Sequence, residues 1–206
     1  MELLGERWTL LILRELMLGP RRFGAIRAEL PGISANVLTQ RLESLTAAGL
    51  VRRRALPPPA SAQVYELTPW GYEAEPVIQT IGRWAARSPR HDPTLAFSAA
   101  SLMLSLRTMF NPVLAAGARA RIGFRLGSES TMVEVEGEQL TFRRTEDFTE
   151  AHLVFTGEAR ILAAFIYGGQ PLAALESAGA LSVEGDRALA EQLPGWFPLP
   201  PKAEAA

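Results

Sequence analysis

The chain has 206 residues, of which 48% are hydrophobic and 21% are charged, and its formal net charge is −1. These values are ordinary for a soluble globular protein of one large or two small domains. The sequence has no cysteine, which excludes disulfides, thiolate catalysis and cysteine-ligated metal, and favours an intracellular setting.

Charge is unevenly distributed along the chain. Residues 1–92 hold 12 arginines against 9 acidic residues, a net charge of +3, whereas residues 93–206 hold 9 basic against 13 acidic residues, a net charge of −4. We therefore expect the two halves to have different partners.

The first segment, residues 2–18, predicts a helix that is apolar nearly all round and ends at Gly19-Pro20. Such a helix must be buried on more than one side, by a second subunit or by the second domain. No basic region precedes its apolar core, so we do not interpret it as a secretion signal. The longest uncharged runs, residues 93–106 and 161–175, are under ~18 residues, so we expect a cytoplasmic protein without a membrane partner.

Residues 21–49 are the most informative stretch. Apolar residues recur at helical spacing on both sides of Pro31-Gly32, which predicts two short helices joined by a tight turn, a helix-turn-helix. Ser34 is placed to cap the second helix, whose outward face is small and polar, as is suited to reading base edges in a major groove. Arg41, at the flank, is assigned to phosphate or to bracing the helix. The residues chosen for base contacts are Asn36, Thr39 and Gln40.

Residues 50–68 switch to two strand-like runs and predict a hairpin, or wing. Arg52, Arg53 and Arg54 are consecutive, so alternation sends Arg53 to the opposite side from its neighbours. In an isolated hairpin, such charges usually discourage aggregation at a sheet edge. Directly after a helix-turn-helix, we favour contacts with phosphates or a minor groove.

A further helix is predicted after the wing, with Thr68 as cap, Pro69 at its first position and a kink or split at Pro76. Its apolar side and the first helix together form our candidate dimer interface. The residues assigned to that interface are Leu4, Trp8, Leu11, Ile78, Ile81 and Trp84.

Four separated motifs between residues 4 and 88 carry a family resemblance. They are Gly5-Glu6-Arg7-Trp8, Gly19-Pro20-Arg21-Arg22-Phe23, Leu38-Thr39-Gln40-Arg41-Leu42 and Tyr65-Glu66-Leu67-Thr68. In order and spacing they resemble the HxlR-type winged-helix regulators. The resemblance implies a prokaryotic transcription factor that dimerises through its first and last helices and places the helix from Ser34 in the major groove of double-stranded DNA. Some such proteins sense oxidants through a cysteine, which this chain lacks.

The polar, proline-containing stretch around residues 89–94 predicts a linker between a domain at 1–88 and a second at 95–206. Beyond it a helical stretch, strand-like runs and further helices predict an α+β domain, an antiparallel sheet with one wet face, covered by helices. Residues 119–193, above all at 151–157, 166–169 and 181–186, resemble the sterol carrier protein type 2 fold. That resemblance implies an apolar cavity for lipids or other hydrophobic molecules.

Aromatic and methionine side chains of the second half could line that cavity, or could simply fill the core. The candidate pocket residues are Phe97, Met103, Met109, Phe110, Phe124, Met132, Phe142, Phe155, Phe165 and Tyr167.

Catalysis has little support in the sequence. The two histidines, His91 and His152, are too few and too far apart to suggest a metal site, and the acidic residues are scattered along strands. We expect no catalytic residue, no metal and no cofactor. The favoured hypothesis is a homodimeric transcriptional regulator that responds to a hydrophobic small molecule. The alternatives are a carrier of lipids or apolar metabolites whose winged helix serves mainly for dimerisation, and a second domain that is only a scaffold.

Overall fold

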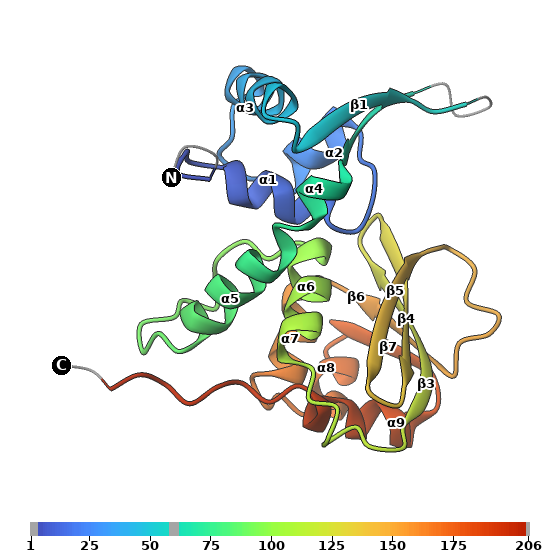
Figure 1. The fold of residues 1–206 in the computed structure, drawn as a ribbon. Helices are drawn as coiled ribbons and strands as arrows, with labels where there is room; N and C mark the ends of the chain where they lie inside the picture. The colour runs from blue at the N-terminus through green and yellow to red at the C-terminus, as the bar shows by residue number, and fades with distance from the viewer. Residues whose placement is uncertain (1–3, 58–61, 205–206) are drawn as a thin grey trace. The chain divides into compact units, whose positions relative to one another are not determined.

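The computed structural model describes residues 4–57 and 62–204 of the chain. The chain divides into two compact units, residues 1–81 and 82–206 (Figure 1). The division falls inside the helix α5 (Glu75–Ala86), ahead of the predicted linker. Residues 89–94 contain neither helix nor strand, and the domain limits proposed from the sequence stay a prediction.

The first unit is a helical domain with a two-stranded hairpin. Its elements before α5 are α1 (Thr9–Leu16), α2 (Phe23–Ala28), α3 (Ala35–Ala47), β1 (Val51–Ala55), β2 (Gln63–Leu67) and α4 (Pro69–Tyr72). Its core is made by the apolar stripes of the helices. Ile12, Ile26, Leu38 and Leu42 are each at most 1% exposed, and burying one such side chain contributes about 1.5–3 kcal/mol to folding. Because α3 buries this stripe, its polar face is left outside.

The first helix is shorter than predicted, because α1 begins at Thr9 and residues 4–8 are not helical. Residues 2 and 3 of the predicted helix lie outside the described residues. The preceding residue, Trp8, has a φ of 80°, a left-handed conformation that a right-handed helix cannot contain. Leu4 therefore lies in a turn outside the helix. The ring of Trp8 approaches Gly32, where an added Cβ would lie 3.7 Å from it.

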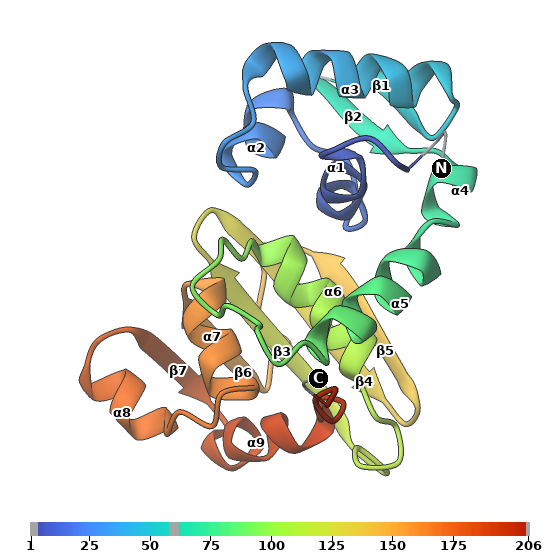
Figure 2. The ribbon, with the colours of Figure 1, turned by 90° about the vertical axis from the view of Figure 1, so that its left-hand side faces the viewer.

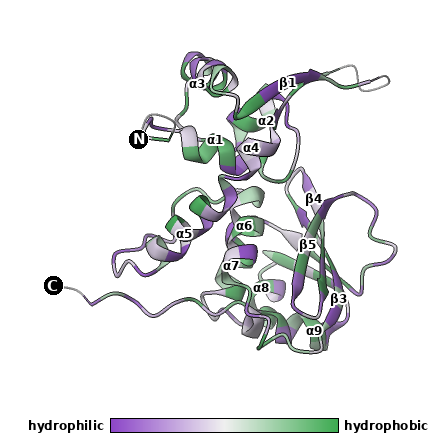
Figure 3. Cartoon of the chain, in the orientation of Figure 1, coloured by the Kyte–Doolittle hydropathy of each residue, from purple (hydrophilic) through white to green (hydrophobic). Residues whose placement is uncertain are grey.

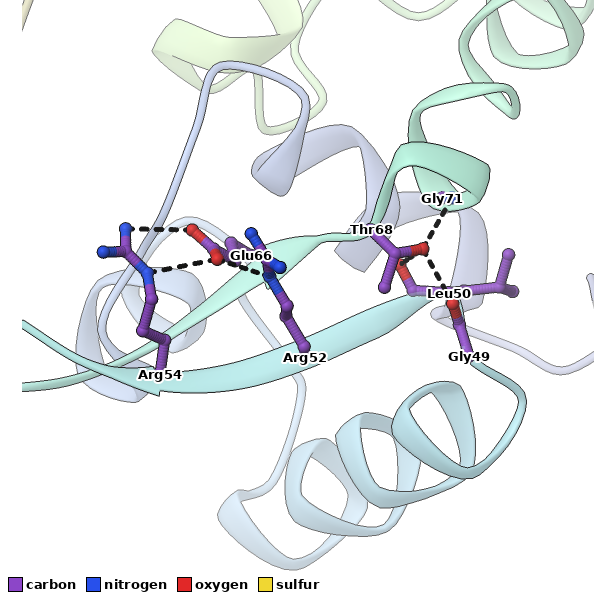
Figure 4. Close-up of polar contacts among 7 residues, drawn as sticks. All are labelled: Gly49, Leu50, Arg52, Arg54, Glu66, Thr68 and Gly71. Atoms are coloured by element: carbon purple, nitrogen blue, oxygen red, sulfur yellow. Dashed lines mark hydrogen bonds and ion pairs between the residues drawn. The ribbon is translucent and has the colours of Figure 1, made fainter.

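The helix predicted after the wing is split in two, as expected. α4 ends at Tyr72, and α5 begins at Glu75 with Pro76 as its second residue, where a missing N–H costs nothing. Thr68 caps α4, because its hydroxyl accepts a hydrogen bond from the Gly71 amide at 3.0 Å and donates to the Gly49 carbonyl at 2.7 Å (Figure 4). The end of α3 and the start of α4 are thereby tied together.

The second unit is built on a five-stranded sheet with the strand order β5-β4-β3-β6-β7. Its strands are β3 (Arg119–Leu126), β4 (Glu129–Glu136), β5 (Gln139–Arg144), β6 (Leu153–Gly157) and β7 (Leu181–Gly185). Its helices are α6 (Ala99–Met109), α7 (Ala159–Ile166), α8 (Leu172–Ser177), α9 (Arg187–Gln192) and the 3-10 turn η1 (Leu193–Trp196). In Figure 2, α6 and α7 lie against the same face of the sheet.

The sheet is mixed, so the expectation of a wholly antiparallel sheet was wrong for one pair. β3 and β6 run parallel, whereas the other neighbouring strands are antiparallel. The reason is the long connection after β5. That edge strand ends at Arg144, and residues 145–152 return the chain to the free side of β3, where β6 enters in the direction of β3. The α+β class is unchanged.

The two faces of the sheet differ in what covers them. On the helix-covered face, Phe124 and Phe155 stack with ring centroids 5.6 Å apart, and Phe155 meets Phe165 of α7 at 5.9 Å. On the other face, Met132, Val154 and Phe148 form a small buried cluster. The sheet face that was predicted to be exposed to solvent is therefore buried at its centre, where Phe148 of the connection 145–152 packs on the sheet.

Candidate nucleic-acid interface

The outward face of α3 is formed as the sequence predicts. The Ser34 hydroxyl accepts a hydrogen bond from the Val37 amide at 3.2 Å, which caps the helix. Asn36, Thr39 and Gln40 are exposed, while Leu38 of the same helix is fully buried. Amide and hydroxyl side chains therefore line the exposed face of α3.

Arg41 makes the bracing contact that was one of its two predicted roles. Its Nη2 lies 2.8 Å from Oε2 of Glu6, in the segment before α1. The arginine is half-buried, and this ion pair joins α3 to the segment before α1. A phosphate contact by Arg41 stays a prediction.

The wing is an antiparallel hairpin with its three arginines on two faces. Arg52 pairs with Glu66 and Arg53 with Tyr65 across the strands. Alternation therefore puts Arg52 and Arg54 on the face of Glu66 and sends Arg53 to the other face, as predicted. Figure 3 shows β1 as hydrophilic over most of its length.

One carboxylate holds two of these arginines. Glu66 Oε1 accepts hydrogen bonds from Nε of Arg52 at 2.6 Å and from Nε of Arg54 at 3.1 Å, and its Oε2 accepts from Nη2 of Arg54 at 3.0 Å (Figure 4). Sequence reasoning missed this contact. The signal was available in the register, because the hairpin places Arg52 directly opposite Glu66.

Glu66 is charged at neutral pH. Burial raises the pKa of its carboxyl, but the hydrogen bonds from Arg54 and Arg52 outweigh that effect and hold the pKa below its ordinary value. The two strands therefore carry three guanidinium groups against one carboxylate, and the wing has a net positive charge.

The middle of β2 is anchored to the segment that leads into the helix-turn-helix. Arg21, just before α2, exchanges two backbone hydrogen bonds with Tyr65 of β2, at 2.9 and 2.8 Å. The Arg21 side chain is itself buried and lies 3.6 Å from Oε2 of buried Glu15 in α1. The wing is thereby tied to the segment between α1 and α2.

The residues assigned to a dimer interface are only partly on one surface. Ile81 and Trp84 of α5 are 42% and 73% exposed, and Val77, which lies one turn earlier, is 44% exposed. These three share one stripe of the helix. Ile78 is half-buried, as are Leu4 and Trp8, while Leu11 of α1 is 36% exposed. Their role in dimerisation is untested.

The candidate pocket residues do not form a single group. Met132 pairs with Gly123, on the opposite face of the sheet from Phe124 and Phe155, so these residues cannot line one cavity. The buried members are Met103, Met109, Phe124, Met132, Phe155 and Phe165, and the half-buried members are Phe97, Phe110, Phe142 and Tyr167. The Tyr167 hydroxyl accepts a hydrogen bond from the Ser105 hydroxyl at 2.9 Å. Burial raises the pKa of Tyr167 above its ordinary value.

Neither a metal centre nor a membrane span is found in residues 4–57 and 62–204. Within those ranges no group of three or more His, Cys, Asp or Glu side chains is arranged to hold a metal ion. None of the described helices has both the length and the apolar character needed to cross a bilayer.

A capped helix, its preceding turn and helix, and a basic hairpin together define a winged helix-turn-helix. A family profile described as HxlR-like helix-turn-helix matches residues 3–92. The uncharacterized HTH-type transcriptional regulator YvaP of Bacillus subtilis is 37% identical over 84 residues, which are 41% of this chain and 78% of that protein. The chain therefore belongs to the HxlR-like helix-turn-helix family.

Other relatives agree over the same part of the chain. The HTH-type transcriptional regulator YodB of B. subtilis is 40% identical over 83 residues, 40% of this chain and 74% of that protein. The structure of its reduced form has a TM-score of 0.40 at 37% identity and covers 44% of this chain and 89% of that one. These relatives are transcriptional regulators, and their similarity leaves most of the second unit uncovered.

The second unit has a structural likeness at low sequence identity. The sec-alkylsulfatase Pisa1 from Pseudomonas sp. has a TM-score of 0.44 at 12% identity, covering 51% of this chain and 16% of that one. A likeness at this level carries no argument about activity. The sterol-carrier-like fold of the second unit stays a prediction.

Proposed function

We propose that the protein is a homodimeric transcriptional regulator that binds double-stranded DNA through α3 and the wing. The observation that carries this proposal is the exposed polar face of a capped α3 beside a hairpin with three guanidinium groups and one carboxylate. Membership of the HxlR-like helix-turn-helix family supports it.

In this proposal the contacts divide by chemistry. Asn36, Thr39 and Gln40 read base edges in the major groove, where a good bidentate contact discriminates by about 1–3 kcal/mol. Arg52, Arg53 and Arg54 contact the flanking phosphates or a minor groove, which adds affinity on every sequence. Two subunits would read half-sites about one DNA turn apart.

The exposed stripe of α5 supports a dimer. Ile81 and Trp84 remain 42% and 73% exposed in the single chain, and a row of large apolar side chains at helical spacing is suited to contact with a second copy. Dimerisation through this stripe would also fix the separation of the two reading helices.

Regulation is assigned to the second unit, which would bind a hydrophobic small molecule. The support for this assignment is the resemblance of residues 119–193 to the sterol carrier protein type 2 fold. In this proposal the C-terminal segment would link the second unit to α5, since Lys202 Nζ donates to the carbonyl oxygens of Ala86 at 3.0 Å and Ser88 at 3.1 Å. A ligand regulates only if it favours one arrangement of α5 over another.

Two experiments test this proposal. Duplexes selected by the full-length protein from a random-sequence pool should converge on a two-fold symmetric site, and a pool that shows no enrichment would contradict DNA reading. Native mass spectrometry should give a dimer, with an added mass that is lost on denaturation. A clean dimer would remove the support for a tightly held effector, and a ligand-loaded dimer without DNA binding would favour the carrier alternative.

A further inference from the structure

The contact between Glu66 and the wing arginines leaves their outer edges exposed. The Glu66 carboxylate accepts one hydrogen bond from Arg52, donated by Nε, and two from Arg54, donated by Nε and Nη2. A guanidinium has five N–H donors in a planar fork, so the remaining donors of both groups stay available. The side chains of Arg52 and Arg54 are 61% and 45% exposed, whereas that of Glu66 is only 9% exposed.

The carboxylate cannot easily leave this arrangement. Glu66 lies near the end of β2 on the same face as buried Val64, and the next residue, Leu67, is also buried. A buried carboxylate without its partners is strongly unfavourable. Glu66 should therefore keep hold of both arginines when a phosphate approaches their outer edges.

We propose that Glu66 is a positioning residue that makes the wing discriminate between a specific site and random DNA. This inference rests on the proposed function. Glu66 lowers the charge of the wing from three positive groups to a net of two, which weakens the attraction common to all sequences. It also holds Arg52 and Arg54 in one geometry, so that a correctly placed phosphate meets donors that are already ordered.

The two effects act differently on the two kinds of DNA. On random sequences binding is mainly electrostatic, so Glu66 reduces affinity. On the specific site the lower charge is offset by the ordered geometry. Replacing Glu66 by glutamine should therefore raise affinity for random DNA and lower the ratio of specific to random affinity.

The test measures affinity for two probes, a fluorescent duplex selected by the wild-type protein and a duplex of random sequence. For E66Q we expect random-sequence affinity to rise about threefold or more and affinity for the selected duplex to change by less than about twofold. E73Q is the matched control, since Glu73 is exposed in the same unit and loses the same charge. An unchanged ratio in E66Q, or the same shift in E73Q, would overturn the inference.

Double variants identify the partners of Glu66. E66Q combined with R52Q or with R54Q should show non-additive effects on the affinity ratio, whereas E66Q with R53Q should be additive, because Arg53 lies on the other face of the hairpin. Additivity in all three pairs would contradict a positioning role. Thermal unfolding checks that each variant folds. If E66Q is unfolded, E66D is used in its place, because aspartate retains the charge. E66D should bind random DNA as weakly as the wild type and should lose affinity for the selected duplex.

The two proposals fail in different ways. If the wild-type protein binds neither probe, the proposed function fails. If it binds the selected duplex more tightly than the random one and E66Q leaves the ratio unchanged, only the role of Glu66 fails.

Discussion

The wing of the first unit and the sheet of the second unit both carry arginines on their strands, yet their charges are balanced differently. In the wing, Arg52 and Arg54 share one carboxylate. In the sheet, four of the five strand arginines each have a carboxylate of their own. The pairs are Arg121–Glu150 at 2.9 Å, Arg125–Glu184 at 3.5 Å, Arg143–Glu134 at 3.7 Å and Arg144–Glu129 at 3.1 Å.

This difference separates a surface that attracts an anionic partner from one that does not. Matched pairs on an exposed sheet largely cancel at a distance, whereas the wing keeps an excess of positive charge. The number of arginines in a strand is therefore a poor guide to nucleic-acid binding, and the number of carboxylates that face them is a better one.

The largest expected effects come from truncating one buried side chain in the core of each unit. F155A removes a fully buried ring from the second unit and should lower the free energy of unfolding by about 3–5 kcal/mol, while L38A under α3 should cost about 2–5 kcal/mol. If only the first unit binds DNA, L38A should abolish DNA binding and F155A should leave it unchanged. Calorimetry together with fluorescence anisotropy would measure both. Equal loss of binding in the two variants would break the comparison.

The next effect concerns the apolar stripe of α5. W84A should weaken the dimer by about 2 kcal/mol or more, as expected for a large aromatic residue at the centre of an interface. The control is L95A, because Leu95 is also highly exposed, at 64%, but lies outside α5. Sedimentation equilibrium would report the dissociation constants, and a W84A protein as dimeric as L95A would remove Trp84 from the interface.

A smaller effect distinguishes the two sets of arginines directly. R53Q should flatten the plot of log affinity for DNA against log salt concentration by about one unit. R143Q, which removes an arginine already paired with Glu134, should leave the slope unchanged. A slope that moves equally in both variants would mean that charge balance does not define the surface.

Much of this interface could be predicted from local sequence. Ser34 and the apolar spacing after it specify α3 and its polar face, because a cap and a helical period are local properties. The split before Pro76 is equally local, since a proline lacks the N–H that a helix interior requires.

The remainder depends on pairing between distant segments. The left-handed backbone of Trp8 interrupts an apolar pattern that looks continuous, so the pattern overestimated α1. The parallel β6 and the burial of Met132 under Phe148 both follow from the path of residues 145–152. Periodicity shows which side chains are buried, and it does not show what buries them.

The smallest expected effect is on pH dependence. Because the pKa of Glu66 is lowered in the folded protein, its stabilising contribution is fully present above the ordinary glutamate pKa and is lost as the pH falls through the lower folded value. Wild-type protein should therefore lose more stability than E66Q on acidification. E134Q, at a more exposed ion pair of the sheet, should behave like the wild type. Chemical denaturation at a series of pH values would show whether E66Q is less sensitive to acid.

The most direct test of a DNA-binding role is the salt dependence of binding by the intact protein. Fluorescence anisotropy would be measured on the selected and the random duplex between about 50 and 200 mM salt. We predict a steep fall of affinity with salt on both probes, and tighter binding of the selected duplex by roughly a thousandfold or more. Absence of binding to either duplex at the lowest salt concentration would contradict the account.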